Sequence, residues 1–240
     1  MGFLIDPYKF VADFSPDDIS NLYSWYDASD STTITKSADR VSAWTNKEGT
    51  SARNLNQGTG GSQPLWVSAD KNGKDVINFV GDRYVLTDAN LASINQPQTV
   101  FIVCKLPASS VLVHHTMSQR TGSTMHPFYK EDNNSVRFSA TTGGAVVINT
   151  PPTLGTWAYV TTVNNGTSGF IRTNGSLEVT TPTDPIGTGN TFEGLVVGRL
   201  QSTASRYWND KIAEIIIYSK LLDATEIGNV ESYLVTKWGF

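Results

Sequence analysis

Hydrophobic positions along most of the chain alternate with polar ones or form short runs, and turn residues separate these segments. Asn-Gly pairs stand at 72–73, 165–166 and 174–175, and Asn133-Asn134 occupies a similar place. Asn and Gly tolerate the positive φ angles of tight hairpin turns. Short strands separated by such turns are typical of an antiparallel β-sandwich. The pattern therefore predicts an all-β fold with several hairpins.

The hydrophobic period changes once, near the end of the chain. Residues 211–218 form a β-branched and aromatic run, which predicts a strand buried on both faces. An amphipathic helix should follow, with Asp223 as its N-cap, Glu226 completing a capping box and Gly239 at its end. The apolar stripe of this helix is Ile227, Val230, Leu234 and Trp238, with Glu231 and Lys237 off the stripe.

The first fourteen residues read as an apolar arm ahead of the domain, which we place at residues 15–240. Ser15 and Pro16 predict a short helix start, because Ser caps helices and Pro suits the first helical position. Two interpretations of the arm remain open: an edge strand of its own domain, or a segment that docks on a neighbouring subunit. The docking side chains in the second case are Phe3, Leu4, Ile5, Tyr8 and Phe10.

Length and charge narrow the range of partners. A chain of 240 residues suits one large all-β domain. Its net charge is −4 without a basic run, so we expect neither a nucleic-acid partner nor an anionic membrane surface. The N-terminus lacks a basic region and a long apolar run, and no stretch reaches the roughly 20 apolar residues that span a bilayer. We therefore expect a soluble protein made in a cytoplasm.

The acids and histidines do not form a recognisable catalytic or metal-binding pattern. A pair of catalytic acids on one strand would stand two residues apart, so that both carboxylates share a face. Glu214 is the strand acid that comes nearest to this pattern, but Ile212 and Ile216 occupy the positions where a partner acid would stand. His114-His115 would point to opposite sides of a strand, and His126 has no nearby ligand in register. We predict no catalytic residue and no metal site.

Two smaller questions concern calcium and the single cysteine. Asp27 with Asp30, and Glu131 with Asp132, carry oxygen ligands of the kind Ca²⁺ prefers. Asx-rich turns use the same residues without an ion, and we favour that interpretation, so no cofactor is expected. Cys104 lies in an apolar strand and is expected to be a buried, unreactive thiol.

Aromatic residues are the remaining clue to function. The chain has six Trp and nine Tyr, most of which should lie in the core. Aromatic side chains in turn-rich or weakly patterned stretches are candidates for a platform on which sugar rings stack, although a core role is the alternative for each. These candidates are Trp66, Tyr84, Phe128, Tyr129 and Trp208.

Several motifs carry a resemblance to a known family. Residues 22–30 are similar to Leu-x-x-Trp-x-Asp-Ala-Ser, and residues 41–49 to Val-x-x-Trp-x-Asp-x-Ser-Gly, with Asn46 and Glu48 departing from that pattern. Together with residues 210–239, they resemble the laminin-G-like jelly-roll group of concanavalin A-like domains, common in bacterial surface proteins and phage virion proteins. The resemblance implies a sandwich of two antiparallel sheets with a short N-terminal helix and a C-terminal amphipathic helix.

The resemblance and the missing catalytic pattern suggest a function. Our leading hypothesis is a non-enzymatic virion-associated protein, a capsid decoration or tail component that binds glycans and localises to the virion. Phage relatives begin with a similar arm, which implies other virion proteins as partners; family analogy predicts a homo-oligomer, a trimer. The alternative is a glycan-degrading hydrolase or lyase whose site lies in residues 107–150. A bacterial surface lectin is a third option, which the lack of a signal peptide counts against.

Overall fold

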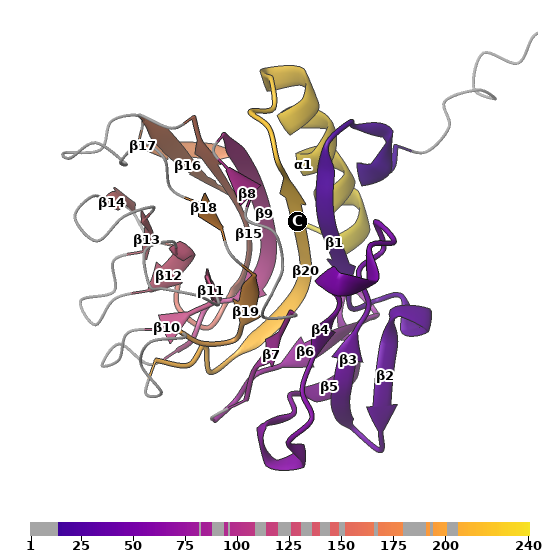
Figure 1. Ribbon diagram of the computed structural model, residues 1–240. Coiled ribbons are helices and arrows are strands. Elements are labelled where there is room, and N and C mark those ends of the chain that lie inside the picture. The colour runs from indigo at the N-terminus through magenta and orange to yellow at the C-terminus, as the bar shows by residue number, and fades with distance from the viewer. Residues whose placement is uncertain are drawn as a thin grey trace, which may run out of the picture.

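The computed structural model describes residues 14–81, 83–87, 94–95, 97–108, 114–119, 126–130, 136–139, 145–148, 152–165, 168–179, 191–192, 194–200 and 206–240. The predicted docking side chains of the arm lie outside these residues, so the placement of the arm stays a prediction. The described chain is mostly β-structure with one α-helix near the C-terminus (Figure 1).

The strands are short and antiparallel. Their bounds are β1 Leu22–Asp27, β2 Ile34–Ser37, β3 Arg40–Trp44, β4 Leu55–Asn56, β5 Leu65–Lys71, β6 Lys74–Asn78, β7 Val85–Leu86, β8 Ile94–Asn95, β9 Gln98–Lys105, β10 His114–His115, β11 Met117–Gln119, β12 His126–Lys130, β13 Val136–Ser139, β14 Ala145–Ile148, β15 Trp157–Asn164, β16 Gly169–Thr173, β17 Ser176–Val179, β18 Thr191–Phe192, β19 Leu195–Val197 and β20 Lys211–Tyr218. The helical elements are the 3₁₀ turns η1 Pro16–Asp18, η2 Ser31–Thr33, η3 Ser51–Arg53 and η4 Gly60–Ser62, and the helix α1 Ala224–Trp238.

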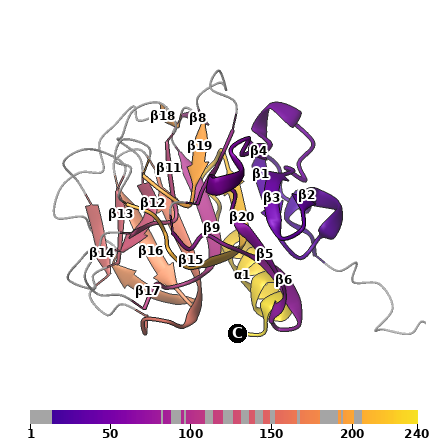
Figure 2. The same cartoon turned by 90° about the horizontal axis from the view of Figure 1, so that it is seen from below.

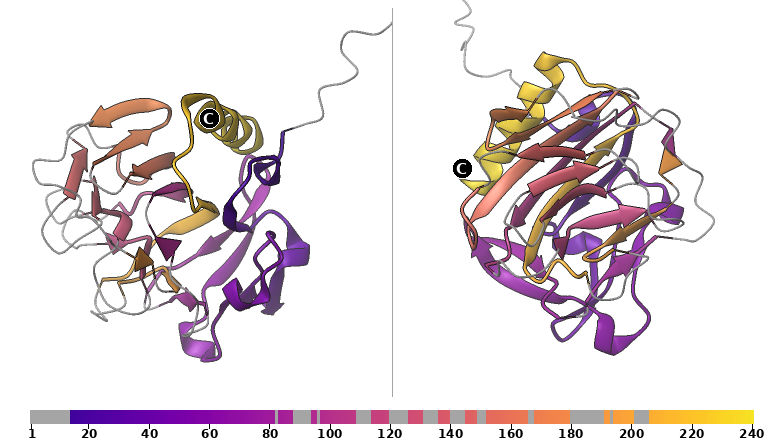
Figure 3. Two further views of the ribbon diagram at one scale, coloured as in Figure 1. Left: turned by 45° about the horizontal axis from the view of Figure 1, so that its top comes forward. Right: turned by 90° about the vertical axis from the view of Figure 1, so that its left-hand side faces the viewer.

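The strands form one long curled sheet, with a four-stranded and a two-stranded sheet beside it. The long sheet has fourteen strands in the order β11-β19-β7-β4-β3-β5-β6-β20-β9-β15-β16-β17, with β1 added to β20 and β2 to β3. It curls around the four-stranded sheet β10-β12-β13-β14, and α1 covers its other side (Figures 1 and 3). The jelly-roll-like antiparallel fold predicted from the sequence is confirmed, although the main sheet is one continuous ladder instead of two.

Strand β20 is the centre of this arrangement. It pairs with β9 along one edge, and with β6 and then β1 along the other. The pairing with β9 shifts register between Ile212 and Glu214, an irregularity of the kind that a β-bulge produces. Ile212 and Ile215 face one core, whereas Ala213 and Ile216 face a second core under α1. The prediction of a strand buried on both faces is confirmed.

Helix α1 follows the predicted boundaries. Asp223 accepts a hydrogen bond from the backbone N–H of Glu226 at 2.8 Å, and Glu226 accepts one from the backbone N–H of Asp223 at 3.1 Å. Gly239 ends the helix with a φ of 68°, in the left-handed region where glycine is favoured. The four predicted apolar side chains are buried in one cluster with residues of β1, β9, β15 and β20: Ile227, Val230, Leu234 and Trp238. Figure 2 shows α1 lying beside β20, β5 and β6.

Two details refine the predicted helices. Glu231 and Lys237 lie off the apolar stripe, yet Glu231 is buried and Lys237 is half-buried, because polar partners on the sheet reach them. The predicted N-terminal helix is only the single 3₁₀ turn η1, since the chain becomes extended at Ile19 to enter β1.

The predicted hairpins form. Asn72 and Gly73 join β5 to β6 with φ angles of 50° and 69°, and Asn174 and Gly175 join β16 to β17 with 49° and 79°. The antiparallel pairing of β12 with β13 and of β15 with β16 confirms the other two hairpins.

Candidate functional site

A buried charged cluster lies where β1, β20 and α1 meet. Asp27 and Glu214 stand opposite each other on the paired strands. The Lys237 ammonium from α1 lies 2.7 Å from Asp27 Oδ2 and 3.0 Å from Glu214 Oε2. The Lys47 ammonium also joins the cluster, 3.3 Å from Asp27 Oδ2 and 3.0 Å from Asp30 Oδ2. Glu214 therefore has an acidic neighbour after all, supplied by a strand far away in the sequence.

The oxygens of Glu214 already accept several hydrogen bonds. Oε1 accepts from Trp25 Nε1 at 2.7 Å and from the Tyr233 hydroxyl at 2.8 Å, and Oε2 accepts from Trp238 Nε1 at 2.5 Å. The side chain has no exposed surface. The Glu214 carboxylate is thus enclosed by its hydrogen-bond donors, and its structural, non-catalytic role stays a prediction.

The pKa values of the two acids of the cluster are shifted in opposite directions. Burial raises the pKa of the Glu214 carboxyl, and Asp27 adds to this effect while Lys237 opposes it. Burial also acts to raise the pKa of Asp27, but the Lys237 ammonium and hydrogen bonds from Lys237 and Ser29 outweigh it, so that pKa lies below its usual value. Asp27 is thus the acid that these cations hold most firmly in its charged form.

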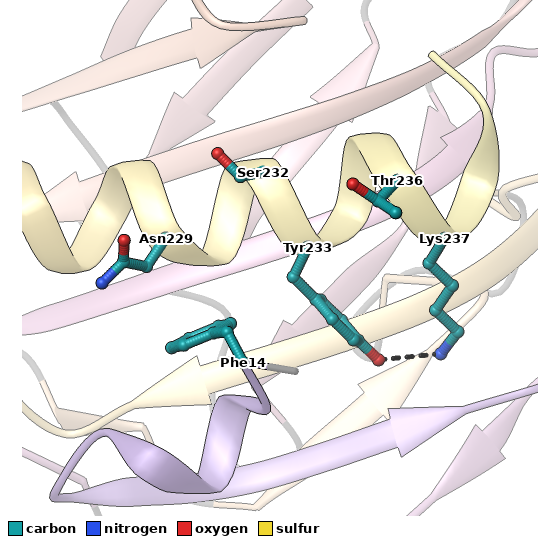
Figure 4. Close-up of a pocket in the computed structure, with 6 residues that line it drawn as sticks. All are labelled: Phe14, Asn229, Ser232, Tyr233, Thr236 and Lys237. Carbon is teal, nitrogen blue, oxygen red and sulfur yellow. Dashed lines mark hydrogen bonds between the residues drawn. The ribbon is translucent and has the colours of Figure 1, made fainter. Parts of the chain in front are cut away.

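A pocket of about 430 Å³ opens beside this cluster, between α1 and the segment that leads into η1 (Figure 4). We call it the α1 pocket. Phe14 and Tyr233 form its aromatic part, with ring centroids 6.3 Å apart in an edge-to-face arrangement. The Tyr233 hydroxyl accepts a hydrogen bond from Lys237 Nζ at 2.9 Å and donates to Glu214. The lining residues are Phe14, Asn229, Ser232, Tyr233, Thr236 and Lys237.

The polar lining of the α1 pocket is available to a ligand. Asn229, Ser232 and Thr236 are exposed on the outer face of α1, three or four residues apart. Within the part of the chain that the structure describes, these three side chains have no hydrogen-bonding partner, and the only hydrogen bond drawn in Figure 4 joins Tyr233 and Lys237. The pocket therefore offers one amide and two hydroxyl groups next to two aromatic rings.

The aromatic residues predicted to bind sugars do not form one site. Trp208 is fully buried in the core, with Nε1 donating to the Lys211 carbonyl, so it has no surface for a sugar. Trp66 and Tyr84 are half-buried, with Lys36 lying 4.0 Å from the ring centre of the first and Arg199 3.6 Å from that of the second. The side chains of Phe128 and Tyr129, on β12, lie outside the described part of the structure.

The α1 pocket was not predicted from the sequence. Its residues come from the end of the arm and from the polar face of α1, which reads as an ordinary solvated helix face. One signal was present: Asn229, Ser232 and Thr236 place uncharged polar residues three or four positions apart on this face.

Other predicted sites can be placed as well. Lysine ammonium groups occupy the neighbourhood of Asp27 and Asp30, where a calcium ion was considered. Among the described residues, no group of three or more His, Cys, Asp or Glu side chains is placed to hold a metal ion. Cys104 is fully buried, and burial raises the pKa of its thiol well above the usual value, as expected for an unreactive cysteine. None of the described helices is both long and apolar enough to cross a membrane.

Solved structures with similar folds include sugar-active and binding proteins. A Trypanosoma rangeli sialidase in complex with 2,3-difluorosialic acid is 11% identical with a TM-score of 0.60, covering 91% of this chain and 33% of the sialidase. Domain 4 of AbnA, an extracellular arabinanase from Geobacillus stearothermophilus in complex with arabinotriose, is 12% identical with a TM-score of 0.57, covering 88% of this chain and 98% of that domain. The binding domain of botulinum neurotoxin serotype D/C is 12% identical with a TM-score of 0.57, covering 92% of this chain and 53% of that chain. At these identities the likeness is one of fold, and this chain spans only a third of the sialidase.

The sequence gives a family match of its own. No curated protein sequence matches this chain. The family model Laminin_G_3, of the concanavalin A-like lectin/glucanases, matches residues 79–228, which include β9, β15 and β20. This match covers more than half of the chain and agrees with the curled antiparallel fold. The protein belongs to the concanavalin A-like lectin/glucanases superfamily.

Proposed function

We propose that this protein is a non-enzymatic glycan-binding module and that the α1 pocket holds a sugar. The observation that carries the proposal is one pocket that combines two aromatic rings, Phe14 and Tyr233, with three polar side chains that have no hydrogen-bonding partner among the described residues. Aromatic rings pack against the apolar faces of sugar rings, and amide and hydroxyl groups donate to and accept from sugar hydroxyls. A volume of about 430 Å³ lies in the usual range of small-molecule sites.

The charges around the α1 pocket favour a neutral sugar. Lys237 is the one lining residue with a charge, and its ammonium lies within 3.0 Å of two carboxylates. An ammonium neutralised in this way attracts an anionic ligand only weakly. The ligand class that fits is therefore an uncharged hexose or pentose.

The similar structures support sugar binding on this fold without naming a ligand for this chain. The arabinanase domain is in complex with arabinotriose, and the neurotoxin domain is a binding domain. The sialidases are enzymes, so the alternative function for this chain is glycan cleavage. Retaining and inverting glycosidases need a carboxylic acid that can reach the glycosidic bond. The carboxylates of Asp27 and Glu214 are enclosed by lysine, tryptophan and tyrosine partners, and this supports binding without cleavage.

Glycan-array binding by the purified protein tests the proposal. We expect neutral glycans to bind, and Asn229→Leu to abolish the signal because it replaces an amide with an apolar group inside the pocket. Thr225→Leu, on the same exposed face of α1 but outside the pocket, is the matched control and should bind like the wild type. Equal binding by Asn229→Leu and the wild type would place the sugar elsewhere. Release of new reducing ends from a polysaccharide panel would contradict the non-enzymatic assignment.

We also propose a structural role in a phage virion, as a capsid-decorating or tail protein that forms a homotrimer. The support is the apolar arm, since Phe3, Leu4, Ile5, Tyr8 and Phe10 would each need a buried environment. The arm joins the domain at Phe14, which packs on Tyr233. Deleting residues 2–13 should leave a folded monomer that no longer assembles, measured by light scattering and by electron microscopy of particles. An unfolded product would make the arm a part of its own sandwich, and normal assembly would refute docking.

A further inference from the structure

A second pocket lies on the opposite flank of helix α1. Its volume is about 420 Å³, close to that of the α1 pocket. We call it the β15 pocket, because Tyr159 of β15 forms one of its walls. Ser232 and Thr236 line both pockets. The residues that line the β15 pocket are Tyr159, Gly228, Glu231, Ser232, Val235 and Thr236.

Helix geometry places the two pockets on either side of a narrow hydroxyl-bearing ridge. With 3.6 residues per turn, Asn229, Tyr233 and Lys237 share one flank of α1. Residues 228, 231 and 235 share the other flank, and Ser232 and Thr236 lie between the two, about 6 Å apart along the axis. Both ridge side chains are exposed. A ligand that leaves the α1 pocket across this ridge therefore meets hydroxyl groups before it reaches the β15 pocket.

The β15 pocket contains a fixed hydrogen-bond acceptor. Glu231 Oε1 accepts from the Thr161 hydroxyl at 2.8 Å, and Glu231 Oε2 lies 3.3 Å from Arg172 Nη2. A carboxylate offers about four acceptor positions, so these two partners leave room for a sugar hydroxyl. The paired Arg172 offsets the charge of Glu231, which keeps this flank suitable for a neutral ligand.

Gly228 keeps the β15 pocket open at the helix surface. A β-carbon built on this residue would have no other atom within 4 Å, so glycine is not required there for packing. Glycine inside a helix is also less stabilising than alanine, so helix stability does not explain its presence there. A larger side chain at this position would project into the pocket that Gly228 lines.

We propose that the β15 pocket is a second sugar subsite, and that the ligand is a neutral oligosaccharide lying across α1 at Ser232 and Thr236. This inference rests on the proposed function of the α1 pocket and specifies its ligand as a chain of sugars. A helix with its side chains is about 10–12 Å across, which is wider than a single sugar ring. Terminal rings occupy the two pockets, and the units between them contact the two ridge hydroxyls.

The test compares oligosaccharide ladders on three variants of the full chain. The probes are arabinan, mannan and β-glucan fragments from monosaccharide to hexasaccharide, titrated by isothermal calorimetry. Gly228→Leu fills the β15 pocket, the neighbouring Asn229→Leu fills the α1 pocket, and Thr225→Leu adds the same side chain on α1 outside both. Melting curves of all three show whether each variant is folded; Gly228→Ala, which adds only a methyl group, is a further control.

The expected result depends on ligand length. In the wild type, affinity should rise by about tenfold between the disaccharide and the longer fragments, which corresponds to about 1.4 kcal/mol. Gly228→Leu should bind the short fragments like the wild type and lose this gain, whereas Asn229→Leu should lose binding at every length. A wild-type affinity that stops rising at the disaccharide, or a Gly228→Leu variant that keeps the gain, would overturn the second subsite and leave the α1 pocket standing. Failure of every fragment to bind to the wild type would overturn both the second subsite and the proposed function of the α1 pocket.

Discussion

The charged cluster under α1 gives the strongest prediction about stability, through the substitution Lys237→Met. The methionine keeps most of the length of the side chain but removes the ammonium that lies 2.7 Å from Asp27 Oδ2 and 3.0 Å from Glu214 Oε2. The two acid side chains are only 5% and 0% exposed, so water cannot replace the lost cation. Removing one partner of a buried ion pair typically costs about 3–5 kcal/mol. In a domain of this size, 1 kcal/mol corresponds to about 2–4 °C, so the melting temperature should fall by about 6–20 °C.

Lys220→Met is the matched control for this substitution. Lys220 Nζ lies 2.6 Å from Glu226 Oε1, but the two side chains are 23% and 27% exposed, and such surface pairs contribute about 0–1 kcal/mol. Denaturant unfolding of both variants, followed by tryptophan fluorescence, measures the two losses under one condition. A loss for Lys237→Met no larger than that for Lys220→Met would refute the idea of a buried ionic cluster.

The pH dependence of Lys237→Met gives an independent check. Without Lys237, the pKa of Glu214 should rise further above its unfolded value, because burial is then less opposed. A carboxyl with a raised folded pKa contributes stability below its unfolded pKa and loses it as pH rises through the folded one. Asp27, whose pKa is lowered in the wild type, contributes stability above its unfolded pKa and loses it on acidification. The difference in unfolding free energy between wild type and variant should therefore be largest in neutral solution and shrink as the pH is lowered. Adding Glu214→Gln to the variant should recover part of the loss.

Three further predictions test the fold. Deleting residues 222–240 uncovers the apolar face of β20 and should give an insoluble product, and a soluble truncation with a cooperative melting transition would contradict this. Gly198→Ala should lower the melting temperature sharply, because the residue has a φ of 94° and its β-carbon would meet the ring of Phe79 and lie 2.9 Å from the Arg83 carbonyl oxygen; an unchanged transition would exclude this strain. Cys104 should react with a thiol reagent only after unfolding, measured by absorbance with and without denaturant, and rapid labelling of the folded protein would show that the thiol is accessible.

Local patterns in the sequence determined much of the fold. The boundaries of β20 and α1 follow from hydrophobic period and capping chemistry, and these signals depend on residues only a few positions apart. The Asn-Gly hairpins follow from the φ angles that Asn72 and Gly73 can adopt. The motifs in residues 22–30 and 210–239 also pointed to the correct superfamily. Each of these features is encoded within a short segment of chain.

Tertiary structure alone decided where the polar and aromatic side chains meet. Asp27 and Glu214 become neighbours only because β1 adds to the edge of β20. In the sequence Lys237 resembles a solvated helix residue, but the packing of α1 on the sheet brings its ammonium to Asp27 and Glu214. Trp208 resembles a surface aromatic in the sequence, but it is fully buried in the folded domain. The α1 pocket likewise needs Phe14 and Tyr233, which are 219 positions apart, to come together. Hydrophobic period reports which side of an element is apolar, but it carries no information about which distant segment will cover the remaining side.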